Sequence, residues 1–269
     1  MNKIRRFLKA IGKELHEHRS SFLVYMILRI LVILVLIVQI YERNFETIFL
    51  SILTLLMLLV PSIIQVTFRV EISTVLESII LLFVFAAQIL GEINGFYVKF
   101  PHWDTLLHTL NGFLAAAIGF SLVDVLNRSE KLIFRVSPFF AVMVSFCFSM
   151  TIGVVWEMFE FLMDQIGGFD MQKDMVVNRI SSVYLDPTGG NTPTAIRNIT
   201  EVYVNNQPLN VGGYLDIGLY DTMFDLIVNF IGAITYSILA YFYLRGNGRG
   251  KLIKRLMMRR KFKSEDYLE

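Results

Sequence analysis

The chain has 269 residues, of which 55% are hydrophobic and only 18% charged, and its mean hydropathy is +0.57. Soluble domains are about 45–50% apolar and about 25% charged, so this composition argues against a soluble enzyme, a nucleic-acid-binding protein and a disordered chain. Cys147 is the single cysteine, which excludes an internal disulfide framework and a cysteine-rich zinc site. The net charge of +2 conceals a partition, because residues 1–20 and 245–269 hold 15 Lys and Arg against 5 Asp and Glu, and the rest sums to −8.

Six apolar stretches are long enough, at about 1.5 Å per residue, to cross a hydrocarbon layer of about 30 Å. The predicted spans are residues 22–40, 46–64, 75–91, 105–125, 138–160 and 222–244. The limits of the second span are the least defined, because it contains Pro61. No small-residue cleavage site follows the first span, so we expect it to be retained rather than removed as a signal peptide. The predicted fold class is an all-α polytopic membrane protein with a bundle of about six transmembrane helices.

The distribution of Lys and Arg predicts the orientation. Six spans place both termini on one side, and the basic tails mark that side as cytoplasmic. Segment 1–21 is then a basic amphipathic cytoplasmic segment, 22–164 carries the first five helices, and 245–269 is a basic cytoplasmic tail. Both tails have apolar residues at helical spacing. They either lie on anionic lipids as interfacial helices or serve only as topology signals.

Residues 165–221 form the one substantial polar segment, and the predicted topology places it outside the cytoplasm. It contains a turn sequence at 186–191 and two short β-prone stretches, 202–204 and 209–211, separated by Asn-Asn-Gln-Pro. These stretches predict a short hairpin. With fewer than 60 residues and no cysteine, the segment is too small to build much core of its own. We expect it to act as an extracytoplasmic loop or lid over the bundle.

Polar residues recur on one face of each of the last three spans. Ionisable residues in a span are costly and indicate function. The three sets are Asp104, His108 and Asn111; Glu157, Glu160 and Asp164; and Asp221, Asp225 and Asn229. In the predicted topology all three lie at the extracytoplasmic edge, and spans four to six contain no Lys or Arg. Six carboxylates at one depth therefore require either bound divalent cations or protonation of several of them.

Oxygen-rich ligation with one imidazole suits Mg²⁺, Mn²⁺ or Ca²⁺, or a carboxylate-bridged zinc or iron pair. The predicted metal ligands are Asp104, His108, Glu157, Glu160, Asp221 and Asp225, with the amides of Asn111 and Asn229 beside them. Whichever of His108, Glu160 and Asp164 is not a ligand would act as general base. Structural roles stay open for single members, since Asp104 and Asp221 can cap helices and Asp164 can be solvated.

Small residues accompany these polar faces. Gly112 and Gly119 lie on span four, Gly153 lies one turn before Glu157 on span five, and Gly232 follows Asn229 on span six. Small residues let membrane helices approach closely. The sequence therefore predicts that spans four to six form one compact unit.

The motifs that carry these residues resemble a known family. They are Trp103-Asp104-x-x-x-His108, Trp156-Glu157-x-x-Glu160-x-x-x-Asp164 and Asp221-Thr222-x-x-Asp225-x-x-x-Asn229-x-x-Gly232. Together they resemble the YjdF-like family of bacterial inner-membrane proteins and, more distantly, the VanZ-like family. The resemblance covers about residues 100–244 and implies a location in the bacterial cytoplasmic membrane, but no particular reaction. The chain departs from VanZ-like proteins in its long segment 165–221 and in lacking their third-region arginine.

Three functions fit the predicted site. The first is a metal-dependent hydrolase or transferase on a lipid-linked or envelope substrate, and the second is a non-catalytic envelope factor with a structural metal. The third is an ion-coupled transporter, against which stand the missing internal repeat and the missing pair of broken spans. The sequence contains neither His-Glu-x-x-His nor a P-loop, which excludes a zincin and a P-loop nucleotide site.

Overall fold

The computed structural model describes residues 3–14, 19–128, 136–246, 248–261 and 267. Six helical stretches are long and apolar enough to cross a membrane, which confirms the predicted fold class. They are Ser21–Glu42, Phe45–Phe68, Thr74–Ile93, Trp103–Asn127, Pro138–Gly167 and Leu219–Arg245. The chain divides into two compact units, Met1–Gly153 with Ile227–Glu269, and Val154–Leu226.

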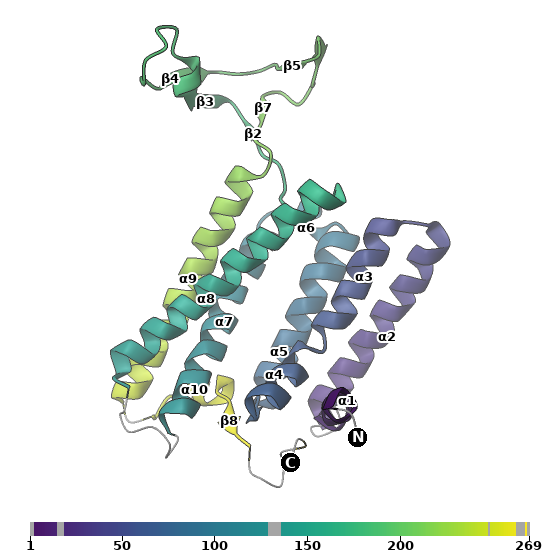
Figure 1. The fold of residues 1–269 in the computed structure, drawn as a ribbon, viewed down its shortest axis with the longest axis vertical. Coiled ribbons are helices and arrows are strands. Elements are labelled where there is room, and N and C mark those ends of the chain that lie inside the picture. Colours follow the sequence, from purple (N-terminus) through teal and green to yellow (C-terminus); the bar gives the residue numbers. More distant parts are fainter. Residues whose placement is uncertain (1–2, 15–18, 129–135, 247, 262–266, 268–269) are drawn as a thin grey trace. The chain divides into compact units, whose positions relative to one another are not determined.

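The first unit begins with α1 (Lys3–Glu14), α2 (Arg19–Glu42), α3 (Phe45–Met57) and α4 (Val60–Phe68) (Figure 1). The predicted second span is thus two helices with a break at Leu58 and Leu59. Pro61 lies in the first turn of α4, where its missing N–H has no intrahelical partner to lose. Asn44 caps α3, since its side chain accepts the N–H of Thr47 at 3.2 Å.

The third span is α5 (Thr74–Phe85), which continues as the π-helical turn η1 (Ala86–Ile93). The short α6 (Phe96–Lys99) leads to α7 (Trp103–Asn127). A buried cluster around Leu28, Val32, Leu58 and Leu81 joins α2 and α5 to the junction between α3 and α4. This part of the unit is held together by large aliphatic side chains, as the composition predicts.

The fourth, fifth and sixth spans, α7, α8 (Pro138–Leu162) and α9 (Leu219–Arg245), pack closely where they belong to the first unit. A Cβ on Gly112 would lie 2.0 Å from the carbonyl oxygen of Asn229, and one on Gly232 would lie 1.9 Å from that of Thr109. These distances leave no room for a side chain. The glycine pattern therefore correctly predicted close approach of these helices.

Two serine hydroxyls fix α8 against α7. Ser145 donates to the carbonyl of Ala116 and Ser149 to the carbonyl of Gly112, each at 2.7 Å. An earlier residue of α8 contacts a later residue of α7, so the two helices are antiparallel. The helices α7 and α9 are parallel, because Asn111 bonds Asn229 and Phe120 contacts Tyr236 further along both helices.

The two tails pack in part on the bundle. α1 contacts α4, and Ala10 and Ile11 form a small cluster with Val66, while Ile4 and Leu8 stay exposed. In the C-terminal tail, α10 (Lys251–Leu256) contacts α5, and β8 (Arg259–Arg260) pairs antiparallel with β1 (Val70–Glu71). Figure 1 shows α1, α10 and β8 at the same end of this unit.

The second unit continues α8 with the π-helical turn η2 (Met163–Gly167) and then contains short strands. They are β2 (Val176–Val177), β3 (Arg179–Ser182), β4 (Thr194–Arg197), β5 (Tyr203–Val204), β6 (Gln207–Pro208) and β7 (Tyr214–Leu215), with the 3₁₀ turn η3 (Val183–Leu185). The pairs β2–β7, β3–β4 and β5–β6 are antiparallel. The predicted hairpin exists as β5–β6, but its return strand begins at Gln207 rather than Leu209. Asn205 and Asn206, both at positive φ, form its turn.

Candidate functional site

The first unit supplies a carboxylate and an imidazole one turn apart on α7. Nε2 of His108 lies 3.4 Å from Oδ1 of Asp104. The His108 side chain is buried, and that of Asp104 is partly exposed. Asp104 is not the helix N-cap, since His102 occupies that position, but it lies in the first turn, where the helix dipole favours an acidic side chain.

Two amides lie one turn further along the same face. Nδ2 of Asn111 donates to Oδ1 of Asn229 at 3.0 Å, and Asn229 is fully buried. Asn229 also lies against Gly153, where a Cβ would come within 2.8 Å of its side chain. The glycine of α8 thus makes room for an amide bridge between α7 and α9.

The second unit holds the remaining carboxylates. Glu157 and Glu160 on α8 are buried, and so is Asp225 on α9. The indole N–H of Trp156 donates to Oε1 of Glu160 at 2.8 Å, across one helical turn. This hydrogen bond fixes the orientation of the Glu160 carboxylate on α8.

Asp164 and Asp221 contact the backbone of the segment that follows η2. Oδ1 and Oδ2 of Asp164 accept the N–H groups of Met171 and Gln172 at 2.6 and 2.9 Å. Oδ2 of Asp221 accepts the N–H of Lys173 at 2.9 Å. Asp164 and Asp221 therefore have a structural role, since they bind the backbone of residues 171–173.

Asp216 also binds backbone N–H groups, and the sequence pattern did not predict this role. Its two oxygens accept the N–H groups of Met175 and Tyr220, each at 2.7 Å. Three carboxylates thus bind the backbone of the stretch 171–175, Asp164 from η2, Asp216 from just before α9 and Asp221 from the first turn of α9. The sequence does carry a signal for this role. Asp216 lies three residues before the first helical residue of α9, and acidic residues near a helix start satisfy its unpaired N–H groups.

Two carboxylates of the second unit, outside the spans, titrate away from their ordinary value of 3.8 in opposite directions. Partial burial, followed by the neighbouring Asp170, Asp216 and Asp164, raises the pKa of Asp174. Hydrogen bonds from the Thr188 side chain and backbone lower the pKa of Asp186. The Asp186 bonds build the turn that the sequence predicted at 186–191.

The structure thus divides the predicted site residues into two sets. Asp104, His108, Asn111 and Asn229 lie in the first unit, and Glu157, Glu160, Asp164, Asp221 and Asp225 lie in the second. Within the first set, Asp104 contacts His108, and Asn111 contacts Asn229. Within the second, Glu157, Glu160 and Asp225 are buried, whereas Asp164 and Asp221 bond the backbone.

Comparison with known proteins gives a family and no individual relative. No curated protein and no solved structure matches the chain. The sequence profile of the family described as "Predicted membrane protein (DUF2238)" matches residues 23–246. This range contains every predicted site residue and all six spans except the first two residues of Ser21–Glu42. The chain is therefore a multi-pass membrane protein that belongs to the DUF2238 family of predicted membrane proteins.

Proposed function

We propose that this protein binds a divalent cation through Asp104, His108 and Asp225 and uses it to hydrolyse or transfer a group of a lipid-linked envelope substrate. The observation that carries the proposal is the contact of Asp104 with the buried His108, next to the Asn111–Asn229 bridge. An imidazole nitrogen beside a carboxylate oxygen is half of a typical mixed-ligand metal site.

Helix continuity supports Asp225 as the third ligand. His108 precedes Asn111 by three residues on α7, and Asp225 precedes Asn229 by four on the unbroken helix α9. The helices α7 and α9 are parallel. One helical turn before the amide bridge, the residue on the same face is therefore His108 on α7 and Asp225 on α9. The three residues offer one nitrogen and two carboxylate oxygens, and a site with three protein ligands keeps positions open for substrate or water.

The same reasoning gives roles to the carboxylates of α8. Glu157 follows Gly153 by four residues, and Gly153 contacts Asn229, so we propose Glu157 as a further ligand. Glu160, oriented by the Trp156 indole, is the general base in the proposal. Asp164 and Asp221 contribute by holding residues 171–173.

The ligand chemistry suits Mg²⁺, Mn²⁺ or Ca²⁺, and also a zinc or iron pair. When bound, such a cation polarises a phosphoryl or acyl oxygen and activates water. The chain's own residues hold the cation, orient Glu160 and accept a proton at its carboxylate. The segment 165–221 is proposed as the lid that excludes water.

The proposal also includes a location. The excess of Lys and Arg in both tails supports cytoplasmic termini. The resemblance to YjdF-like and, more distantly, VanZ-like proteins supports the cytoplasmic membrane of a bacterium. The exposed apolar residues Ile4 and Leu8 beside basic residues of α1 support contact of this helix with anionic lipids.

The test is turnover of lipid phosphates and acylated lipids by the protein in nanodiscs, with added metal and with chelator. We expect metal-dependent turnover that Glu160→Gln lowers by about 10²–10⁴-fold while the metal stays bound. His108→Ala removes the nitrogen ligand of the proposed site. Its matched control is His102→Asn, because His102 is exposed and lies at positive φ, which asparagine tolerates. If chelation lowers Tm but no tested lipid is turned over, the metal is structural and the catalytic part of the proposal is wrong.

A further inference from the structure

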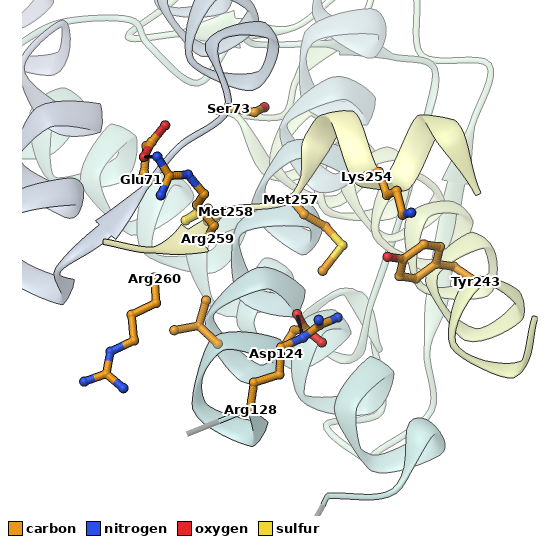
Figure 2. Close-up of a pocket in the computed structure, with 11 residues that line it drawn as sticks. Glu71, Ser73, Asp124, Arg128, Tyr243, Lys254, Met257, Met258, Arg259 and Arg260 are labelled. Carbon is orange, nitrogen blue, oxygen red and sulfur yellow. Dashed lines mark ion pairs between the residues drawn. The ribbon is translucent and has the colours of Figure 1, made fainter. Parts of the chain in front are cut away.

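A cavity of about 470 Å³ lies in the first unit, at the ends of α7 and α9 and beside α10. Figure 2 shows Lys254 and Tyr243 on one side of it, Glu71 and Arg259 on the other, and Asp124 with Arg128 below. None of these residues belongs to the site proposed above. Cavities of roughly 300–1,000 Å³ are the size class that holds small ligands.

Long-range contacts build the walls of this cavity. The antiparallel pair of β1 and β8 sets Glu71 opposite Arg259, and their side chains form an ion pair. The hydroxyl of Ser73 donates to the backbone carbonyl of Arg255. The C-terminal segment is therefore fixed against the bundle, which shapes the cavity before any ligand arrives.

The charge of the walls favours an anion. Four cationic and two acidic side chains line the cavity: Arg128, Lys254, Arg259, Arg260, Glu71 and Asp124. Both acids are engaged, since Glu71 pairs with Arg259 and Asp124 with Arg128, the latter at 2.8 Å. Asp124 raises the pKa of the Arg128 guanidinium. In the part of the chain that the structure describes, Lys254 has no carboxylate in ion-pair contact.

The cavity also has an apolar part. Val125, Met257 and Met258 line it between the charged groups, and Figure 2 shows the Met257 side chain between Tyr243 and the Asp124–Arg128 pair. A cavity with a net positive charge, two guanidinium groups held by carboxylates and an apolar wall suits an anion that has an apolar portion.

We propose that this cavity binds the phosphate group of a phosphomonoester or phosphodiester, with Lys254 and Arg128 as the principal contacts. The ligand is either the headgroup of an anionic lipid or a soluble phosphate compound, since both present the same oxygens. An ammonium and a guanidinium bind phosphate by charge-assisted hydrogen bonds, and the Met257 wall contacts the carbon atoms next to it. The site is independent of the metal site.

The test measures binding of three probes to the full chain in detergent: dihexanoyl phosphatidic acid, inorganic phosphate and dihexanoyl phosphatidylcholine. We expect Lys254→Gln to weaken binding of the anionic probes by about tenfold, because it removes a charge-assisted contact. Lys251→Gln is the matched control, since Lys251 is exposed on the same helix and does not line the cavity. It should change affinity by no more than about twofold, through long-range charge alone.

Asp124→Asn should change the affinity for the anionic probes in the opposite direction from Lys254→Gln. It removes the charge that engages Arg128 and should therefore strengthen binding of the anionic probes, which a loss of folding could not do. Binding of phosphatidic acid alone would identify a lipid headgroup, and equal binding of inorganic phosphate a soluble ligand. If neither anion binds, if phosphatidylcholine binds equally well, or if Lys251→Gln weakens binding as much as Lys254→Gln, the proposal is wrong.

Discussion

At the scale of single residues, a substitution of Asp164 tests whether this residue has a structural or a catalytic role. Both of its oxygens accept backbone N–H groups, so Asp164→Ala should leave two donors without acceptors, at about 1–3 kcal/mol each. We expect faster hydrogen exchange at residues 168–175. Asp170→Asn, at an exposed position nearby, is the control. Unchanged exchange in Asp164→Ala together with lost turnover would instead make Asp164 the base.

The raised pKa of Asp174 predicts a pH dependence for the second unit. The folded state binds this proton more tightly than the unfolded state, so the ionised carboxylate lowers stability above the folded pKa. Stability should increase as the pH falls from the folded pKa toward 3.8, measured as hydrogen exchange of residues 165–221. Asp174→Asn should remove this contribution. For Asp186, with its lowered pKa, the sign is reversed, and stability is lost as the pH falls below 3.8 through the folded value.

At the scale of helices, the contact of α7 with α9 depends on the lack of side chains at two positions. A Cβ on Gly232 would lie 1.9 Å from the Thr109 carbonyl oxygen, so Gly232→Ala must push the helices apart, at a cost of roughly 1–3 kcal/mol or more. Gly12→Ala on α1 meets nothing within 4 Å and should be neutral or stabilising by up to about 1 kcal/mol. Thermal unfolding in detergent compares the two. Equal Tm values for both variants would show that the close approach does not stabilise the fold.

Elements that depend on residues close together in the sequence could be predicted, whereas elements that depend on contacts between distant residues could not. The six spans depend on local apolar runs, and their predicted ends lie within a few residues of the observed ones for most spans. The second and fifth spans extend further, to Phe68 and Gly167. The pairing of β1 with β8 joins Glu71 to Arg259 across the chain, and two-residue strands carry no periodicity from which to predict them.

The site residues show the same division. Their helical spacing on α7, α8 and α9 was readable from the sequence, and the Asn111–Asn229 contact agrees with it. The roles of Asp164 and Asp221 were not readable, because their backbone partners at 171–173 lie in an irregular segment. A carboxylate that binds an N–H and one that binds a cation have the same sequence pattern.

At the scale of the whole molecule, the two tails are joined by a buried ion pair. The ammonium of Lys261 contacts both carboxylate oxygens of Glu14, and both side chains are almost fully buried. Removing one partner of a buried pair costs about 3–5 kcal/mol, so Lys261→Ala should lower Tm strongly. Lys9→Ala, at an exposed position of α1, should not. The double variant Glu14→Leu/Lys261→Met should recover most of the loss, and a double variant as unstable as Lys261→Ala would contradict this account.

The central claim is a divalent cation held by the acid–imidazole set of the last three spans. Elemental analysis of detergent-purified wild type beside Asp104→Asn/Asp225→Asn tests it most directly, with Asp170→Asn/Asp174→Asn as a control that removes two carboxylates outside the spans. We predict about one equivalent of a divalent metal in the wild type and the control, and none in the Asp104/Asp225 variant. No metal in the wild type, or metal retained in that variant, would contradict the claim and make protonation the explanation for the buried carboxylates.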